Sequence, residues 1–496
     1  MAPAESNERK WILLLCAVAA IHVFVFSAAF PFFNVVDEEA HFDLAVKSSH
    51  GHVPRALEPM CDESRQFYVF YLSQEYVLPA RAGHLFPPPM WDWPTNQAAP
   101  VLAARMSQWN DPNHESSQPP LYYSLAGLWW LLGKMCGFHG GYLLYWLRFL
   151  NLPLIAALVW LGYLAARLLF PANPFLRLAV PALLAFFPQA SFYAIDNDVL
   201  CPLCFGVAFL LLVRFDQAGT PGIGLGMAAG LALAATFLTK LTNLPLLAVA
   251  ALFLAAKVWH LARAGKLRAA VPALLALALS AGLPMAGWLV WCRFNYGDWT
   301  GTAAKIQFLG WTHKSLSQWW HHPIFTPQGF GLFFTQLVAT FWQGGFLWHG
   351  QSPALPGVDA IYVMLSVVFV ALALAGLRSR SAAATGSQRH ALWFGFWSLA
   401  AAIAFFGFLS IIYDFHDCVR PSRAQPYFMF GRLMLGGLIP FVILFAYGLD
   451  RALSRVKKQW IGRLVLAAMI LFMLISECAV DWPVFSSPYN WYHLPP

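Results

Sequence analysis

The chain has 496 residues, of which 59% are hydrophobic and only 11% are charged. Soluble proteins carry about 25% charged residues, so this composition excludes an ordinary soluble enzyme and predicts a polytopic membrane protein. The formal net charge of +8 does not indicate a nucleic-acid partner, because the basic residues lie mainly between apolar runs and form no tract interleaved with aromatics.

The first apolar run covers residues 11–33. A helix needs roughly 20 residues to cross the hydrocarbon core, and a signal peptide has an apolar region of only about 7 to 15. We therefore expect this run to be retained as a membrane span. Arg9 and Lys10 precede it, which places the tail formed by residues 1–10 in the cytoplasm.

Further apolar runs recur along the chain, which predicts an all-α fold of about eleven transmembrane helices. They cover residues 142–169, 176–192, 199–213, 225–238, 241–256, 269–291, 360–377, 391–413, 433–449 and 464–478. The expected organisation is a membrane module over 11–291 with a long outer loop at 34–141, and a second outer loop at 292–359. C-terminal membrane helices over 360–478 and an outer tail at 479–496 complete it.

Basic residues support this topology, because they fall in the predicted inner loops, as the positive-inside rule requires. Lys257, Arg263, Lys266 and Arg268 gather near one such loop. Counting residues 121–132 as a span would turn these loops outward, and about 12 residues are too few to cross. We expect that run to form a helix on the outer surface. The predicted location is the cytoplasmic membrane, with the N-terminus inside.

Polar residues that suit catalysis gather in the predicted outer segments. Three acids directly follow the first span, where Trp, Tyr, Lys and Arg would serve a membrane interface better. A positioned carboxylate can take a proton from an acceptor. The candidates along the chain are Asp37, Glu38, His41, Glu115, Gln118, Asp196, Asp198, Lys240 and Arg432.

Each candidate also has a structural interpretation. Acids such as Asp37 are favoured at a helix N-terminus by the helix dipole. His41 suits a structural hydrogen bond better than a ligand role, and Glu115 suits capping as well as substrate contact. The Asp196 turn can be held by side-chain hydrogen bonds alone, and Lys240 can extend to the interface from between two spans.

The sequence indicates no cofactor and no metal site. It contains no phosphate-binding loop, dinucleotide fingerprint or zinc-spaced Cys/His set. Four of the eight cysteines, Cys61, Cys292, Cys418 and Cys478, fall on or near the predicted outer side. One or two disulfides are compatible with them, and no pairing is assigned.

The order of several short motifs resembles a known superfamily. After the first span and its acidic pair come Pro119-Pro120-Leu121-Tyr122-Tyr123, Arg148-Phe149-Leu150-Asn151, the Asp196 turn and Leu238-Thr239-Lys240. This order resembles the GT-C superfamily of membrane glycosyltransferases, and is similar to protein O-mannosyltransferases and lipid A aminoarabinose transferases. It resembles most an uncharacterised bacterial membrane family allied to them, whose late Gln-Gly-Arg-Tyr-like motif corresponds to Phe430-Gly431-Arg432-Leu433. The resemblance covers residues 35–245 best.

The resemblance implies transfer of a hexosyl or pentosyl group from a polyprenyl-phosphate donor, on the extracytoplasmic face and with inversion. It makes Asp37 the base or charge partner of the acceptor and Glu38 the second catalytic acid, with the other candidates binding substrate. The acceptor would be a glycan, a lipid or a protein, and membrane lipid would surround the chain.

One motif departs from the family pattern. Ser117-Gln118-Pro119-Pro120 stands where aminoarabinose transferases have Glu-Lys-Pro-Pro. Arg432, Lys240 or Lys305 would then have to meet the phosphate. The alternatives are a lipid or polysaccharide transporter or flippase, whose ionisable groups lie at mid-membrane within repeats, and a catalytically silent scaffold.

Overall fold

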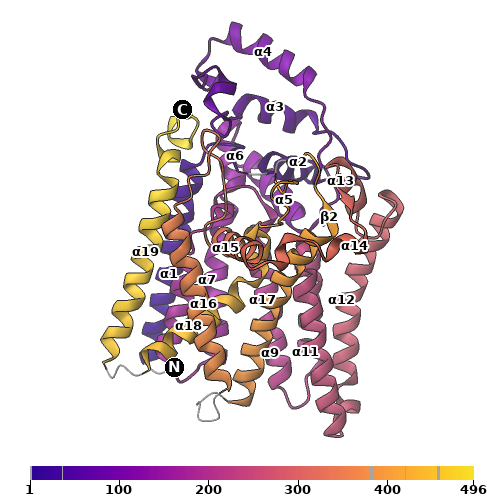
Figure 1. Cartoon of the computed structure of the whole chain (residues 1–496), viewed down its shortest axis with the longest axis vertical. Coiled ribbons are helices and arrows are strands. Elements are labelled where there is room, and N and C mark those ends of the chain that lie inside the picture. The colour runs from indigo at the N-terminus through magenta and orange to yellow at the C-terminus, as the bar shows by residue number, and fades with distance from the viewer. Residues whose placement is uncertain (1–2, 36, 379–384, 419, 455–457, 496) are drawn as a thin grey trace.

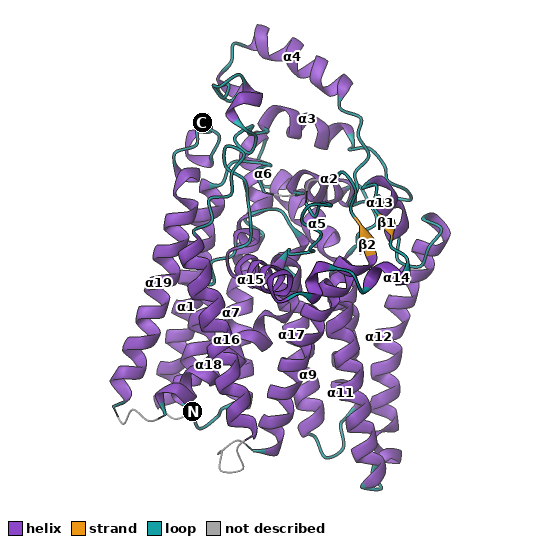
Figure 2. Ribbon diagram, viewed as in Figure 1, coloured by secondary structure: helices purple, strands orange, loops and turns teal. Residues whose placement is uncertain are grey.

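The computed structural model describes residues 3–35, 37–378, 385–418, 420–454 and 458–495. Long helices form a bundle, and shorter helices and loops cover one end of it (Figures 1 and 2). We call this covered end the loop end. The other end, which holds the connections at residues 170–173, 218–222 and 264–266, is called the far end, and the N-terminus lies there (Figure 1).

Helices make up nearly all of the regular structure. The α-helices are α1 (Pro3–Ala29), α2 (Glu38–Ser49), α3 (Asp62–Tyr71), α4 (Thr95–Gln108), α5 (Leu121–Met135), α6 (Gly140–Arg148), α7 (Asn151–Leu169), α8 (Pro174–Ala185), α9 (Cys201–Gln217), α10 (Ile223–Thr239), α11 (Leu244–Arg263), α12 (Leu267–Asn295), α13 (Thr302–Phe308), α14 (Leu316–Trp319), α15 (Pro327–Gln343), α16 (Pro356–Arg378), α17 (Gly386–Ile412), α18 (Leu438–Leu453) and α19 (Gln459–Phe485). The 3-10 helices are η1 (Pro79–Ala82), η2 (Met90–Asp92), η3 (Ala190–Tyr193), η4 (Asn197–Val199), η5 (Leu241–Asn243), η6 (Pro323–Phe325), η7 (Gly431–Gly437) and η8 (Trp491–His493). Strands β1 (Thr312–His313) and β2 (Tyr413–Asp414) pair antiparallel, with Thr312 opposite Asp414.

The prediction of an all-α polytopic protein is confirmed, because every predicted apolar run overlaps a helix. Among the described residues, 9 helical segments are long and apolar enough to cross a membrane. The predicted count of about eleven is not confirmed, since α8 and α10 are shorter than a span. Helix α8 ends at Ala185, three residues before Pro188, which lacks the backbone N–H that a continuing helix needs.

Helix α18 lies at the centre of the bundle, between α8, α9, α16 and α17. The most apolar stretch of the segment formed by η7 and α18 is 89% buried inside the protein, whereas that of α12 is only 22% buried. Both stretches have the same mean hydropathy of 1.9. A Cβ added at Gly448 would lie 1.8 Å from the carbonyl oxygen of Phe369, so only glycine allows α16 to approach this closely. This central position places η7, which begins α18, in the middle of the loop end.

The loop end contains the two long connections predicted from the sequence, together with the segment from β2 to η7. Helix α2 packs on α5, the helix that we expected on the surface, and Gly127 allows the close contact with Ser49. Helix α15 is viewed nearly end-on in Figure 1, so it lies across the bundle axis. One boundary needs correction, because helix α19 continues to Phe485, beyond the end expected at residue 478. All eight cysteines lie within the described residues and are unpaired there.

Candidate functional site

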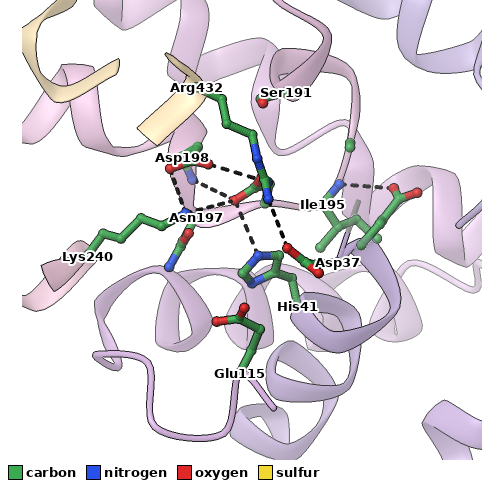
Figure 3. A network of polar contacts seen from close by, with 12 residues as sticks. Asp37, His41, Glu115, Ser191, Ile195, Asn197, Asp198, Lys240 and Arg432 are labelled. Atoms are coloured by element: carbon green, nitrogen blue, oxygen red, sulfur yellow. Dashed lines mark hydrogen bonds and ion pairs between the residues drawn. The ribbon is translucent and has the colours of Figure 1, made fainter. Parts of the chain in front are cut away.

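One guanidinium joins two acids that lie far apart in the sequence (Figure 3). Arg432, in η7, donates from Nη2 to Asp37 Oδ2 at 2.9 Å and from Nη1 to Asp196 Oδ2 at 2.6 Å. Asp37 precedes α2 in a left-handed conformation, with φ of 67°, and Asp196 precedes η4. Three separate segments of the chain therefore meet at this residue.

Lys240 provides a second cation beside the first. It follows α10 in an extended conformation, and its Nζ lies 2.7 Å from Asp198 Oδ1 and 3.8 Å from Asp196 Oδ1. The backbone N–H of Asp198 also donates to Asp196 Oδ1 at 2.9 Å. The expected side-chain hydrogen bond within this turn is thus present, and the turn also belongs to a charge cluster. We call Asp37, Asp196, Asp198, Lys240 and Arg432 the polar cluster.

His41 connects the polar cluster to α5. Its Nδ1 lies 2.7 Å from the Tyr123 hydroxyl, and its Nε2 lies 3.4 Å from Asp196 Oδ1. Burial lowers the pKa of His41 and outweighs the charges of Asp196 and Glu115, which raise it. A neutral imidazole that bridges Tyr123 and Asp196 accounts for these contacts.

The end of the first loop approaches the same cluster. His114 Nε2 lies 3.2 Å from Asp37 Oδ1. Glu115 forms an ion pair with Lys305 of α13 and accepts a hydrogen bond from Gln118 Nε2 at 2.5 Å. The structure therefore brings all but one of the candidate residues to one place, together with His114, which the sequence did not single out.

Glu38 is the candidate that lies apart from the cluster. Its carboxylate is fully buried and accepts from Arg148 Nε at 2.8 Å and Nη2 at 2.7 Å, and from the backbone N–H groups of Phe33 and Ile195 at 2.9 and 3.0 Å. These contacts hold the start of α2 against α6 and the Asp196 turn. The expectation that Glu38 is a second catalytic acid is therefore revised, because four donors already engage its carboxylate and no solvent reaches it.

Asp37 is the most accessible acid of the polar cluster. Its side chain is 23% exposed, against 1% for Asp196 and Asp198. Burial raises the pKa of Asp37, but the hydrogen bond from His114 and the charge of Arg432 outweigh it and hold the pKa well below its usual value. Asp37 is consequently ionised at neutral pH and can accept a hydrogen bond from a bound hydroxyl.

Asp37, His114 and Glu115 could also hold a metal ion. Each offers one ligand atom, and these three atoms lie within 4.8 Å of one another. Carboxylate and imidazole ligands suit several divalent metals. Glu115 Oε1 already pairs with Lys305, so a cation bound through that oxygen would have to compete with the ammonium group.

Three solved structures are similar to this chain. The Archaeoglobus fulgidus oligosaccharyltransferase, solved with zinc and sulfate, has 11% identity and a TM-score of 0.43, over 94% of this chain and 53% of that one. Archaeoglobus fulgidus AglB, with an inhibitory peptide and a dolichol-phosphate, has 11% identity and a TM-score of 0.45, over 96% and 56%. ArnT from Cupriavidus metallidurans, bound to undecaprenyl phosphate, has 12% identity and a TM-score of 0.35, over 90% and 79%. The chain thus spans about half the length of the two oligosaccharyltransferase chains.

No curated protein matches the chain. The family described as predicted membrane protein (DUF2142) matches residues 21–413. That range contains Asp37, Glu115, Asp196 and Lys240 and ends before Arg432. The expected resemblance to an uncharacterised membrane family is confirmed at this level. The chain belongs to the predicted membrane protein family DUF2142.

Proposed function

We propose that this protein is a membrane transferase that moves a sugar from a polyprenyl-phosphate donor to an acceptor at the loop end. The contact of Arg432 with both Asp37 and Asp196 carries the proposal. Transfer from such a donor requires a cation for the departing phosphate and a carboxylate for the acceptor. Arg432 and Asp37 supply both groups within one contact, at the boundary between the bundle and the loop layer.

The proposed reaction is an inverting displacement. The acceptor hydroxyl attacks the anomeric carbon, the bond from that carbon to the phosphate oxygen breaks, and polyprenyl phosphate leaves with the bonding electrons. Asp37 accepts the hydroxyl proton. Arg432 binds the departing phosphate, to which a guanidinium can present two parallel donors.

Donor binding would also activate Asp37. The charge of Arg432 is one of the causes that lower the pKa of Asp37. When Arg432 turns to the donor phosphate, Asp37 loses that partner, so its pKa rises and it becomes a better proton acceptor. The pairing in the structure is thus a resting arrangement, in which the base is held ionised until the donor arrives.

The remaining candidates are proposed to position these two groups and the substrates. Lys240 holds Asp198 and lies near Asp196, so it keeps the acidic turn beside Arg432. His41 holds the same turn from α2. Glu115 and Gln118 tie the first loop to α13 and to the Asp196 turn, where an acceptor would enter.

We place the loop end on the extracytoplasmic face, because basic residues flank the connections at the far end, among them Arg167, Arg177 and Lys266. Thiol labelling in intact cells tests this orientation, with the native cysteines replaced. Ser107→Cys and Ser486→Cys, both exposed at the loop end, should react with an impermeant reagent. Ala264→Cys, exposed at the far end, should react only after lysis and is the matched control. The opposite pattern would invert the topology.

Release of polyprenyl phosphate tests the transferase activity itself. Purified protein should release it from at least one hexosyl or pentosyl donor when acceptor extract from the membrane is added. Asp37→Asn should abolish most of the release. Asp216→Asn, the same change at the far end, should leave it unchanged. Release that is equal in all three proteins would show that the polar cluster is not the active site.

A further inference from the structure

A cavity of about 910 Å³ opens at the far end, away from the polar cluster. It lies between the first turns of α1, the start of α8, the end of α18 and the start of α19. We call it the far-end groove. Its lining includes Trp11, Leu14, Leu15 and Val18 of α1, Phe175 and Leu178 of α8, and Gly462 and Arg463 of α19.

The walls of the far-end groove are mainly apolar and continue onto the outer surface of the bundle. Trp11 is 63% exposed and Leu14 is 51% exposed, and both line the groove. Trp460 and Leu464, exposed on the first turns of α19, extend the apolar surface beside it. A groove with such walls, open at the side of a membrane bundle, is accessible to a lipid chain.

Four charged side chains belong to the lining of the groove. Its two acids already have partners, because Glu8 pairs with Arg177 at 2.9 Å and Asp450 accepts from Asn173 Nδ2 at 3.0 Å. Its two bases, Lys458 and Arg463, are exposed and form no ion pair with any described residue. The groove therefore presents two exposed positive charges, those of Lys458 and Arg463, to a ligand.

We propose that the far-end groove binds an anionic glycerophospholipid of the surrounding bilayer. An acyl chain lies along the α1 and α8 wall, and the phosphate lies between Lys458 and Arg463. Basic pockets between membrane helices on the cytoplasmic side bind anionic lipid headgroups in this way. The groove lies at the end of the bundle opposite Arg432, so this lipid is distinct from the donor and the inference does not rest on the proposed transferase activity.

Native mass spectrometry of the full-length protein tests the headgroup. The protein is titrated with phosphatidylglycerol and, in parallel, with phosphatidylcholine of the same chains. We expect phosphatidylglycerol to bind more tightly. Replacing both bases, in Lys458→Gln/Arg463→Gln, should weaken it about thirtyfold, since each base near an anionic headgroup contributes about fivefold. The control Lys266→Gln/Arg268→Gln removes two exposed bases at the same end outside the groove and should bind normally.

A second pair of variants tests the apolar part of the groove without changing its charge. A Cβ at Gly462 would meet Phe175 at 3.6 Å and Leu453 at 3.7 Å, and both residues line the groove. Gly462→Ala should therefore be tolerated and still bind lipid. In Gly462→Trp the indole should fill the groove and abolish lipid binding. Size-exclusion profiles identify any variant that misfolds.

Three results would overturn the proposal. The first is equal affinity of the wild-type protein for the two headgroups. The second is unchanged phosphatidylglycerol binding by both Lys458→Gln/Arg463→Gln and a folded Gly462→Trp. The third is a double variant that no longer binds undecaprenyl phosphate but still binds phosphatidylglycerol. That result would assign the groove to a prenyl lipid.

Discussion

Both ends of this bundle carry arginines and lysines, but the bases differ in whether they contact acids or face solvent. At the loop end Arg432, Lys240 and Lys305 each hold an acid from a distant segment. At the far end Lys266 and Lys458 are exposed on short connections. Charge counts along the sequence locate both ends, but only the structure shows which bases hold acids of distant segments together and which, like Lys266 and Lys458, stay exposed.

A similar contrast separates two adjacent residues. Asp37 is partly exposed and meets Arg432 and His114, whereas Glu38 is fully buried on Arg148. Asp37 has a left-handed conformation, and among the described residues its side chain shares no partner with that of Glu38. Neighbouring acids can thus have separate roles, one in the proposed chemistry and one in holding the start of α2.

Asp37→Asn should give the largest effect on turnover. Asn keeps the size of Asp but cannot accept a proton at neutral pH, so turnover should fall about 10²–10⁴-fold. Donor affinity should survive, because Arg432 remains. Single-turnover rates at saturating donor and acceptor measure the change. A near-normal rate would remove Asp37 from the role of base.

Glu38→Gln should act on stability more than on chemistry. It leaves Arg148 buried without its carboxylate, which costs about 3–5 kcal/mol when a buried pair is broken. The apparent Tm in detergent should drop sharply, and by much more than for Asp37→Asn at the partly exposed neighbour. Equal Tm values for these two variants would contradict the distinction between them.

Arg432→Lys should show a smaller and different loss. Lys keeps the charge but not the planar fork, so about one charge-assisted hydrogen bond is lost. That corresponds to about a tenfold loss of kcat/KM for the donor, shared between a higher KM and a lower kcat, because Arg432 binds the phosphate in the donor and as it departs. Lys305→Arg is the control, because it preserves charge at a base that holds only Glu115. A change confined to kcat would show that Arg432 does not bind the donor.

The His114 contact with Asp37 should give the smallest effect, visible in the pH dependence of stability. Burial lowers the pKa of His114, but the hydrogen bond to Asp37 and the charge of Glu115 raise it above its usual value. Protonated His114 therefore stabilises the folded state. This stabilisation is fully present below about pH 6.5, the pKa of histidine in the unfolded chain, and is lost as the pH rises through the pKa of His114 in the folded protein. The Tm difference between wild type and His114→Gln should shrink over the pH interval above about 6.5. A Tm difference that grows as the pH rises would mean that the pKa of His114 is lowered in the folded protein, which would contradict this account.

Much of the architecture is readable from the sequence because membrane spans depend on local hydropathy. The apolar runs that form α1, α9 and α16 can be predicted from hydropathy and length alone, without knowledge of the packing. The burial of α18 and the partner of Glu38 depend on packing instead, since Arg148 lies 110 residues away. His114 was missed for the same reason, because only the fold brings it to Asp37. Its position next to Glu115 was the one local signal.

A structure with polyprenyl phosphate bound tests the central claim most directly. The account predicts phosphate oxygens about 3 Å from the Arg432 guanidinium, a normal hydrogen-bond distance, with Asp37 released from Arg432. Phosphate bound elsewhere, with Arg432 still joined to both Asp37 and Asp196, would contradict it.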